Sequence, residues 1–264
     1  MFSTSMRYTL PFALVAIAVS SYLLSSTHAA EPKETKPLDP PRIAMCVPLA
    51  LPTGVSSKLI VRGWGLAEAK EVRSSNPKLT IKIVAGSKCE VPNGQDAKLV
   101  GDTQIELEVT IAADVEIGKA ELTIVSPSGE SKPHTLLVGS GHLAIIENES
   151  NDGFRQAQKL QVPQVVDGQI HADRNVDVFE FELLEKQSVS IEVIAHRQGS
   201  NLDSLLTLFD TGGTIIAVSD DHSGTADSQI TADLPAGKYF ISLQDAHDHG
   251  GPAHPYRLVV AAKP

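Results

Sequence analysis

The sequence predicts an all-β protein made of two β-sandwich domains. Short stretches of alternating apolar and polar residues recur along the chain, turn-forming residues separate them, and no stretch of adequate length has a helical period. At 264 residues the chain exceeds one ordinary domain of roughly 100–150 residues, so two are expected. Many short strands with frequent turns are typical of antiparallel sandwiches and jelly rolls.

The first 41 residues are predicted to lie outside the folded domains. Residues 1–29 have the features of a secretory signal peptide: Arg7 is the only charge, an apolar run covers about 10–24, and a small-residue cleavage site ends at Ala29. A retained membrane anchor is the alternative, although the run is shorter than the roughly 18–20 residues of a spanning helix. Residues 30–41 are rich in proline and charge and predict a linker. We therefore expect a secreted, periplasmic or cell-envelope protein with no membrane segment after cleavage.

Strand-like alternation occurs on both sides of a predicted boundary at Gly139-Ser140-Gly141. The first domain is expected at 42–139 and the second at 145–264. In the first, the alternating stretches are 57–63, 79–84, 104–109 and 120–125. In the second, they are 178–183, 189–194, 205–209, 214–218, 239–243 and 256–260.

Negative charge is concentrated in the second half. Residues 30–140 carry 14 acidic and 13 basic side chains, whereas residues 141–264 carry 18 acidic and 8 basic ones, a net charge of −10. An acidic surface repels phosphate backbones, so nucleic acid is excluded as a partner of that half.

Cys46 and Cys89 are the two cysteines, and both lie in the first half. In an exported chain an even pair predicts one disulfide, which would stabilise that half by about 3–4 kcal/mol. Two buried free thiols are the alternative.

Two segments rich in side-chain oxygens predict a cation site. Five oxygen-bearing side chains besides a serine fall within 147–152, ENESND, and a second oxygen-rich turn, DRNVD at 173–177, opens a strand. Calcium takes about six to eight oxygen ligands, so the two segments together could form one site. An acidic linker followed by an ordinary turn is the alternative.

Residues about 145–264 resemble the bacterial pre-peptidase C-terminal domain, which is related to the collagen-binding domains of bacterial collagenases. The matching residues are Glu147-x-Glu149-x-Asn151-Asp152, Val166-x-Gly168-x-Ile170, Asp177-Val178-Phe179, Leu202-Asp203-x-x-Leu206, Asp220-Asp221, Gly237-x-Tyr239, and Gly250-Gly251 with Tyr256-Arg257-Leu258. Residues about 42–139 resemble an immunoglobulin-like domain of the IPT/TIG kind through Pro52-x-Gly54, Val61-x-Gly63-x-Gly65-Leu66 and Gly118.

The resemblance implies an immunoglobulin-like sandwich followed by a jelly-roll-like sandwich that binds calcium. It assigns Glu147, Glu149, Asn151 and Asp152 to the first part of the site, and Asn175 and Asp177 to the second. The chain departs from the family at Asn175, where aspartate is common, and the lost charge should weaken affinity. Collagen binding is not carried over, because the second half has no tryptophan and only two tyrosines, Tyr239 and Tyr256.

A histidine-rich loop is a second candidate metal site. The run DAHDHGGPAH at 245–254 contains three histidines and two aspartates, which suit zinc or copper. Its glycines and proline are equally typical of an exposed loop without a metal.

Catalysis is not expected from this sequence. It has neither a Gly-x-Ser-x-Gly elbow nor a His-Glu-x-x-His helix. The turn Asp220-Asp221-His222-Ser223 contains the residue types of a catalytic triad, but neighbours on one turn cannot orient one another as a triad requires. We therefore expect a secreted, non-catalytic, calcium-stabilised module for binding or adhesion to an extracellular polymer or protein. A structural or accessory subunit that docks onto a secreted hydrolase is the alternative.

Overall fold

The computed structural model describes residues 1–2, 39–91, 95–139 and 144–263, and a compact unit spans Pro37–Pro264. Residues 3–29 of the predicted signal peptide, most of the predicted linker at 30–41, and residues 140–141 of the predicted boundary lie outside the described residues. Within the described ranges, no helix is both long enough and apolar enough to cross a membrane.

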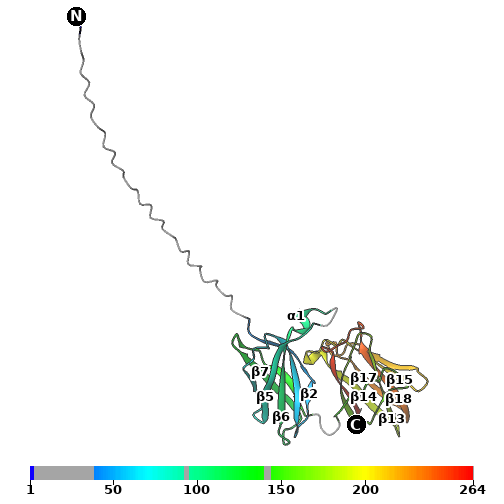
Figure 1. Ribbon diagram of the computed structural model, residues 1–264. Coiled ribbons are helices and arrows are strands. Elements are labelled where there is room, and N and C mark those ends of the chain that lie inside the picture. Colours follow the sequence, from blue (N-terminus) through cyan, green and yellow to red (C-terminus); the bar gives the residue numbers. More distant parts are fainter. Residues whose placement is uncertain (3–38, 92–94, 140–143, 264) are drawn as a thin grey trace. The chain divides into compact units, whose positions relative to one another are not determined.

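Residues 42–138 form two facing sheets (Figure 1). One has the order β1-β3-β6-β5, and the other has the order β2-β9-β7-β4, with β8 paired to β7. The strands of the first sheet are β1 (Arg42–Val47), β3 (Ser56–Trp64), β5 (Leu79–Lys88) and β6 (Thr103–Ile111). The second contains β2 (Ala50–Leu51), β4 (Glu71–Ser74), β7 (Gly118–Ser126), β8 (Gly129–Glu130) and β9 (His134–Val138). A single helical turn, α1 (Ala97–Val100), precedes β6.

Alternation along the strands builds the core of this first sandwich. On β6 the apolar residues Ile105, Leu107 and Val109 are fully buried, and the polar residues between them point outward. They pack in one cluster with side chains of the opposite sheet such as Leu122 and Leu136. All four stretches predicted for this half lie within observed strands.

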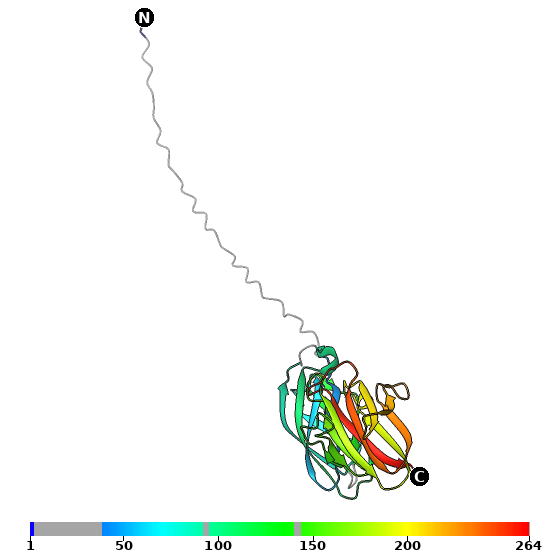
Figure 2. The same cartoon turned by 90° about the vertical axis from the view of Figure 1, so that its right-hand side faces the viewer.

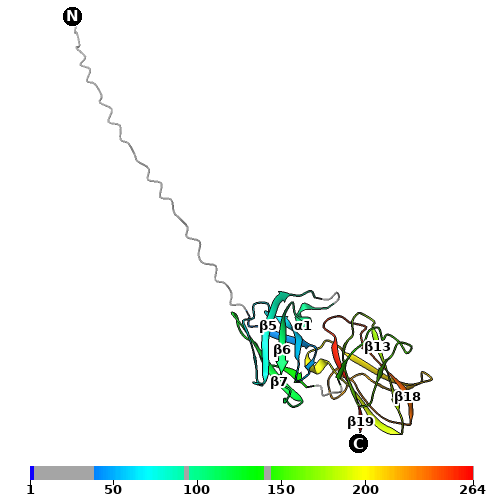
Figure 3. The ribbon, with the colours of Figure 1, turned by 60° about the horizontal axis from the view of Figure 1, so that its bottom comes forward.

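Residues 144–263 form a second pair of sheets, with the orders β10-β12-β19-β14-β17 and β11-β13-β18-β15-β16. The C-terminal strand β19, red in Figures 2 and 3, is central in the first of these sheets. The strands of that sheet are β10 (Ala144–Ile146), β12 (Gln164–Gln169), β14 (Gln187–Ile194), β17 (Gln229–Leu234) and β19 (Pro255–Lys263). The facing sheet contains β11 (Gln158–Leu160), β13 (Val176–Leu183), β15 (Ser204–Asp210), β16 (Ile215–Ser219) and β18 (Gly237–Asp245), and a short 3-10 turn (His196–Gln198) follows β14.

The second core lies between these two sheets. Phe179 and Phe181 of β13 pack in the same cluster as Ile191 of β14 and Leu258 of β19. Each of the six stretches predicted here overlaps an observed strand. The all-β sandwich prediction is confirmed.

Three pairings differ from the antiparallel expectation. β2 with β9, β10 with β12, and β11 with β13 are parallel. β10 to β13 alternate between the two sheets, so consecutive strands pack face to face instead of forming hairpins. These edge strands have two or three residues each, which is too few for a period to appear in the sequence.

The two cysteines are too far apart for the predicted disulfide. Cys46 lies on β1, whereas Cys89 follows β5, and the order β1-β3-β6-β5 puts three strand spacings between them. At roughly 4.8 Å per spacing, their Cα atoms are about 14 Å apart, and a disulfide needs about 7 Å or less. Both cysteines are free, and the predicted disulfide is corrected accordingly. Burial raises the pKa of the Cys46 thiol to about 12.

Candidate cation site of the second sandwich

Glu147 follows β10 and turns its carboxylate into the second sandwich, where the side chain is only 3% exposed. Its Oε1 accepts a hydrogen bond from the Tyr256 hydroxyl at 2.6 Å and one from Asn151 Nδ2 at 3.2 Å. Its Oε2 accepts from the backbone N–H of Gln169 at 2.9 Å. The carboxylate is therefore fixed from three directions, by β19, β12 and its own segment.

Gly168 makes room for this arrangement. It pairs with Tyr256 across β12 and β19. A Cβ atom at position 168 would lie 2.5 Å from Tyr256 Cζ and 2.7 Å from Glu147 Oε2. Only glycine lets the tyrosine ring and the carboxylate meet there.

Asp177 presents two buried oxygens without partners. It lies on β13 between Val176 and Val178 and is fully buried. Neither carboxyl oxygen of Asp177 has a hydrogen-bond partner among the described residues, and the same holds for Asn151 Oδ1. Tyr256 lies close by, but it donates its one hydroxyl proton to Glu147. Burial is the main cause and the neighbouring Glu147 carboxylate the second cause that raise the pKa of Asp177 to about 9.

Glu149 and His171 complete the cluster at its exposed side. His171 Nδ1 lies 2.7 Å from Glu149 Oε1 and 3.9 Å from Glu147 Oε2. One ligand atom from each of these three residues lies within 4.8 Å of the others. A cavity of about 330 Å³ is lined by all three together with Tyr256, so the cluster is open to solvent.

Asp152 and Asn175 form a separate pair. Asn175 Nδ2 donates to Asp152 Oδ1 at 3.0 Å, while Asn175 Oδ1 accepts from the backbone N–H of His171 at 2.8 Å. Asp152 is exposed and Asn175 is half-buried, and the amide oxygen of Asn175 already accepts from the backbone. The six residues predicted for the site therefore fall into two groups. Glu147, Asn151 and Asp177 are buried together, with Glu149 at their exposed side. Asp152 and Asn175 form a separate pair.

The donor set fits a hard cation. The cluster contains three carboxylates and one amide oxygen, and three of its oxygens are buried without a hydrogen-bond partner in the described part of the chain. Buried carboxylates that repel one another cost free energy unless a proton or a cation joins them. Calcium prefers such oxygens. His171 and Tyr256 were missed from the sequence, because only strand pairing brings them beside the 147–152 segment.

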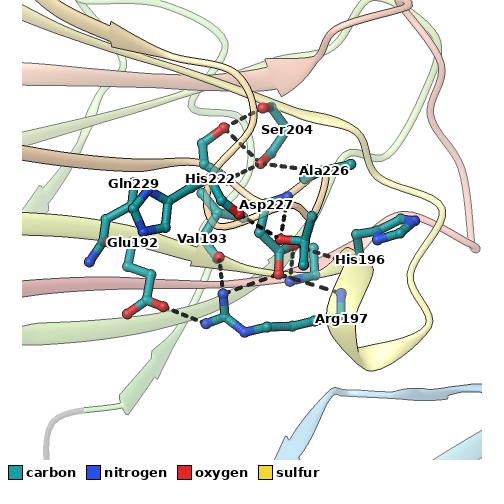
Figure 4. A network of polar contacts seen from close by, with 12 residues as sticks. Glu192, Val193, His196, Arg197, Ser204, His222, Ala226, Asp227 and Gln229 are labelled. Atoms are coloured by element: carbon teal, nitrogen blue, oxygen red, sulfur yellow. Dashed lines mark hydrogen bonds and ion pairs between the residues drawn. The ribbon is translucent and has the colours of Figure 1, made fainter.

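A polar network holds the turn after β14 (Figure 4). Asp227 is buried, and its carboxylate accepts from the backbone N–H groups of Ala195 at 2.9 Å and His196 at 2.6 Å. Arg197 Nη1 lies 3.2 Å from Asp227 Oδ2, and Arg197 Nη2 lies 2.5 Å from Glu192 Oε1. The contacts of Asp227 serve to fix the backbone of this turn.

The Asp220–Ser223 turn makes backbone contacts. The backbone N–H of His222 donates to Thr225 O at 3.2 Å, and the carbonyl of Asp220 accepts from Ser228 Oγ at 2.6 Å. The His222 side chain is exposed. These contacts close a turn at the edge of the sheet.

Comparison with known proteins supports the resemblance in the second half. Residues 175–245 match the family model described as the bacterial pre-peptidase C-terminal domain. A probable subtilase-type serine protease of Deinococcus radiodurans is 28% identical over 141 residues, which cover 51% of this chain and 19% of that protein.

Two solved structures are similar at low sequence identity. The pre-peptidase C-terminal domain of a Bacillus anthracis collagenase is 15% identical, with a TM-score of 0.34, and covers 43% of this chain and 99% of its own. PliG of Aeromonas hydrophila, a periplasmic inhibitor of g-type lysozyme, is 18% identical, with a TM-score of 0.30, and covers 40% of this chain and 99% of its own. Residues 175–245 of this chain are therefore similar to the bacterial pre-peptidase C-terminal domain.

Proposed function

We propose that this protein is an exported, non-catalytic binding or accessory module whose second sandwich is stabilised by calcium. Glu147, Glu149, Asn151 and Asp177 would hold the ion. The observation that carries the proposal is the set of three buried oxygens on Asn151 and Asp177 that have no hydrogen-bond partner among the residues the structure describes and that lie beside the carboxylate of Glu147.

Calcium would supply the positive charge that this cluster lacks. Asp177 is deeply buried beside Glu147, and no Lys or Arg side chain is paired with either carboxylate among the described residues. Calcium would accept both side chains together with the Asn151 oxygen, and water would complete its six to eight ligands. Because Glu147 to Asn151 precede β11 whereas Asp177 lies on β13, the ion would join the entry segment to the sandwich.

A melting experiment tests the calcium site. A ligand that binds only the folded state at 100 times its Kd adds about 2.7 kcal/mol to the free energy of unfolding. The melting temperature should therefore rise in calcium and fall in chelator. Asp177→Asn and Glu149→Gln should reduce the response, whereas Glu182→Gln, an exposed change on the same strand, should retain it. Equal melting curves of the natural protein in calcium and chelator would remove the proposal.

The non-catalytic assignment is supported by the family and by the roles of polar groups in the Asp220–Ser223 turn. The pre-peptidase C-terminal domain that residues 175–245 match is a non-catalytic domain, and backbone atoms of the turn are engaged in closing it. Hydrolysis of a protein or glycan substrate that disappears with His222→Gln would contradict the assignment.

The partner would be an extracellular polymer or a secreted protein. Sedimentation with insoluble cellulose, peptidoglycan and collagen would reveal a polymer-binding module acting alone. Co-purification with a larger hydrolase from the native host would support the accessory subunit instead. If neither occurs, both forms of the proposal fail.

A further inference from the structure

We propose that His247 and His249, together with the carboxylate of Asp203, form a zinc-binding site on the loop that follows β18. The site lies in the second sandwich, separate from the Glu147 cluster, and does not depend on the proposed calcium ion. Three histidines lie in this loop, and two of them have exposed side chains. His254 is 2% exposed and packed inside, whereas the side chains of His247 and His249 are 66% and 58% exposed.

The two exposed imidazoles are at a distance that one metal ion can span. Their ring centres are 6.1 Å apart and their planes differ by 15°. With a zinc–nitrogen distance of about 2.0–2.1 Å, each ring centre lies about 3.2 Å from the metal, so two rings on a tetrahedral zinc lie about 5.2 Å apart, roughly 1 Å closer than here. Both side chains are exposed, so rotamer changes can bring them to one ion.

Each imidazole already faces a carboxylate. His247 Nδ1 lies 3.3 Å from Asp203 Oδ2, and His249 Nδ1 lies 3.8 Å from Asp245 Oδ1. Zinc between His247 Nδ1 and Asp203 Oδ2 could bind both atoms, because two ligands about 2.0–2.1 Å from a tetrahedral ion lie about 3.3 Å apart. Asp203 would then supply both an oxygen ligand and negative charge.

The backbone that carries these side chains is fixed by Asp245. Its side chain is 1% exposed, and its Oδ1 accepts from the backbone N–H groups of His247 at 2.9 Å and His249 at 3.0 Å. Its Oδ2 accepts from the N–H of Asp203 at 3.1 Å. One buried carboxylate thus places all three proposed ligand residues relative to one another.

The surroundings favour a cation. A cavity of about 640 Å³ is lined by His247, His249, Asp203 and Asp245, with His196 on its wall. Asp220 and Asp221 each bring a carboxylate oxygen within 4.8 Å of Asp203. The negative potential attracts divalent ions, and the two imidazoles select a borderline metal such as zinc over calcium.

Zinc titration by calorimetry, in saturating calcium to cover the Glu147 cluster, tests the site. We expect one zinc ion per chain. Affinity should fall at least tenfold in His247→Gln and in His249→Gln, and several-fold in Asp203→Asn. The matched control is His222→Gln, an exposed histidine on another turn, and it should bind zinc as the natural protein does.

Calcium competition and histidine NMR signals distinguish zinc bound at this loop from zinc bound elsewhere. Calcium at millimolar concentration should not displace the zinc, and the side-chain NMR signals of His247 and His249 should shift on zinc addition while that of His222 stays. Unchanged zinc affinity in both His247→Gln and His249→Gln, or loss of binding in a control variant instead, would overturn the proposal. Melting curves of the variants without zinc would show whether each one is folded.

Discussion

Replacing Asp177 with asparagine should change how pH controls the stability of the second sandwich when calcium is absent. Burial and the neighbouring Glu147 raise the pKa of Asp177 from its ordinary 3.8 to about 9 in the folded protein. Between these two values the folded state holds a proton that the unfolded state releases. A rise in pH therefore favours unfolding. Below the lower value both states are protonated, and this group no longer affects stability.

The size of the effect follows from the two pKa values. Each pH unit between them removes about 1.4 kcal/mol from the free energy of unfolding, so the wild type should lose about 4 kcal/mol through this group between pH 4 and pH 7. Asparagine is nearly isosteric with the protonated acid and does not titrate. In chelator, Asp177→Asn should match the wild type near pH 4 and be more stable by about 4 kcal/mol at pH 7. In saturating calcium the order should reverse, because the ionised carboxylate then binds the ion.

Urea unfolding read by hydrogen-exchange mass spectrometry would measure this. Peptides from β13 and β19 report on the second sandwich alone, which matters because a chain with two sandwiches need not unfold in one step. Glu182→Gln on the exposed side of β13 is the control and should follow the wild type at every pH.

A pH-independent stability difference would contradict the raised pKa of Asp177. If the difference between Asp177→Asn and the wild type in chelator stayed constant from pH 4 to pH 7, the carboxyl would not be held protonated by the fold. If the variant also kept the full calcium response, Asp177 would not be a ligand.

Three further predictions follow from buried groups. Arg257→Met should lower the free energy of unfolding by about 3–5 kcal/mol, because it leaves Asp167 buried without its partner at 2.7 Å, and a urea curve identical to wild type would contradict this. Gly168→Ala should weaken calcium binding at least tenfold in a calorimetric titration, because the new Cβ would lie 2.5 Å from the neighbouring tyrosine ring; unaltered affinity would show that the ring can move without cost. In the native protein a thiol reagent should modify Cys89 but reach Cys46 only after unfolding, and a reducing agent should leave the melting temperature unchanged; a melting temperature that falls on reduction would argue for a disulfide.

The longer strands could be predicted because their periodicity is local. The stretch 104–109 alternates in the sequence, and in β6 the same alternation separates the core from solvent. The edge strands β2, β10 and β11 could not be predicted, since two or three residues contain no period and the partner strand fixes their conformation. The disulfide prediction failed because the presence of two cysteines says nothing of strand order.

The candidate cation site was also predictable only in part. The all-β class and the oxygen-rich segment Glu147–Asp152 follow from the order of the residues alone, because both are properties of neighbours in the chain. Which oxygens of the described residues are buried without a partner depends on the folded chain, as does the contact of Glu147 with Tyr256, 109 residues further on. Folding also buries Asp177, whereas Asn175, two residues earlier, pairs with the exposed Asp152. Burial and contact between distant segments depend on the register between strands, and no local pattern records that register.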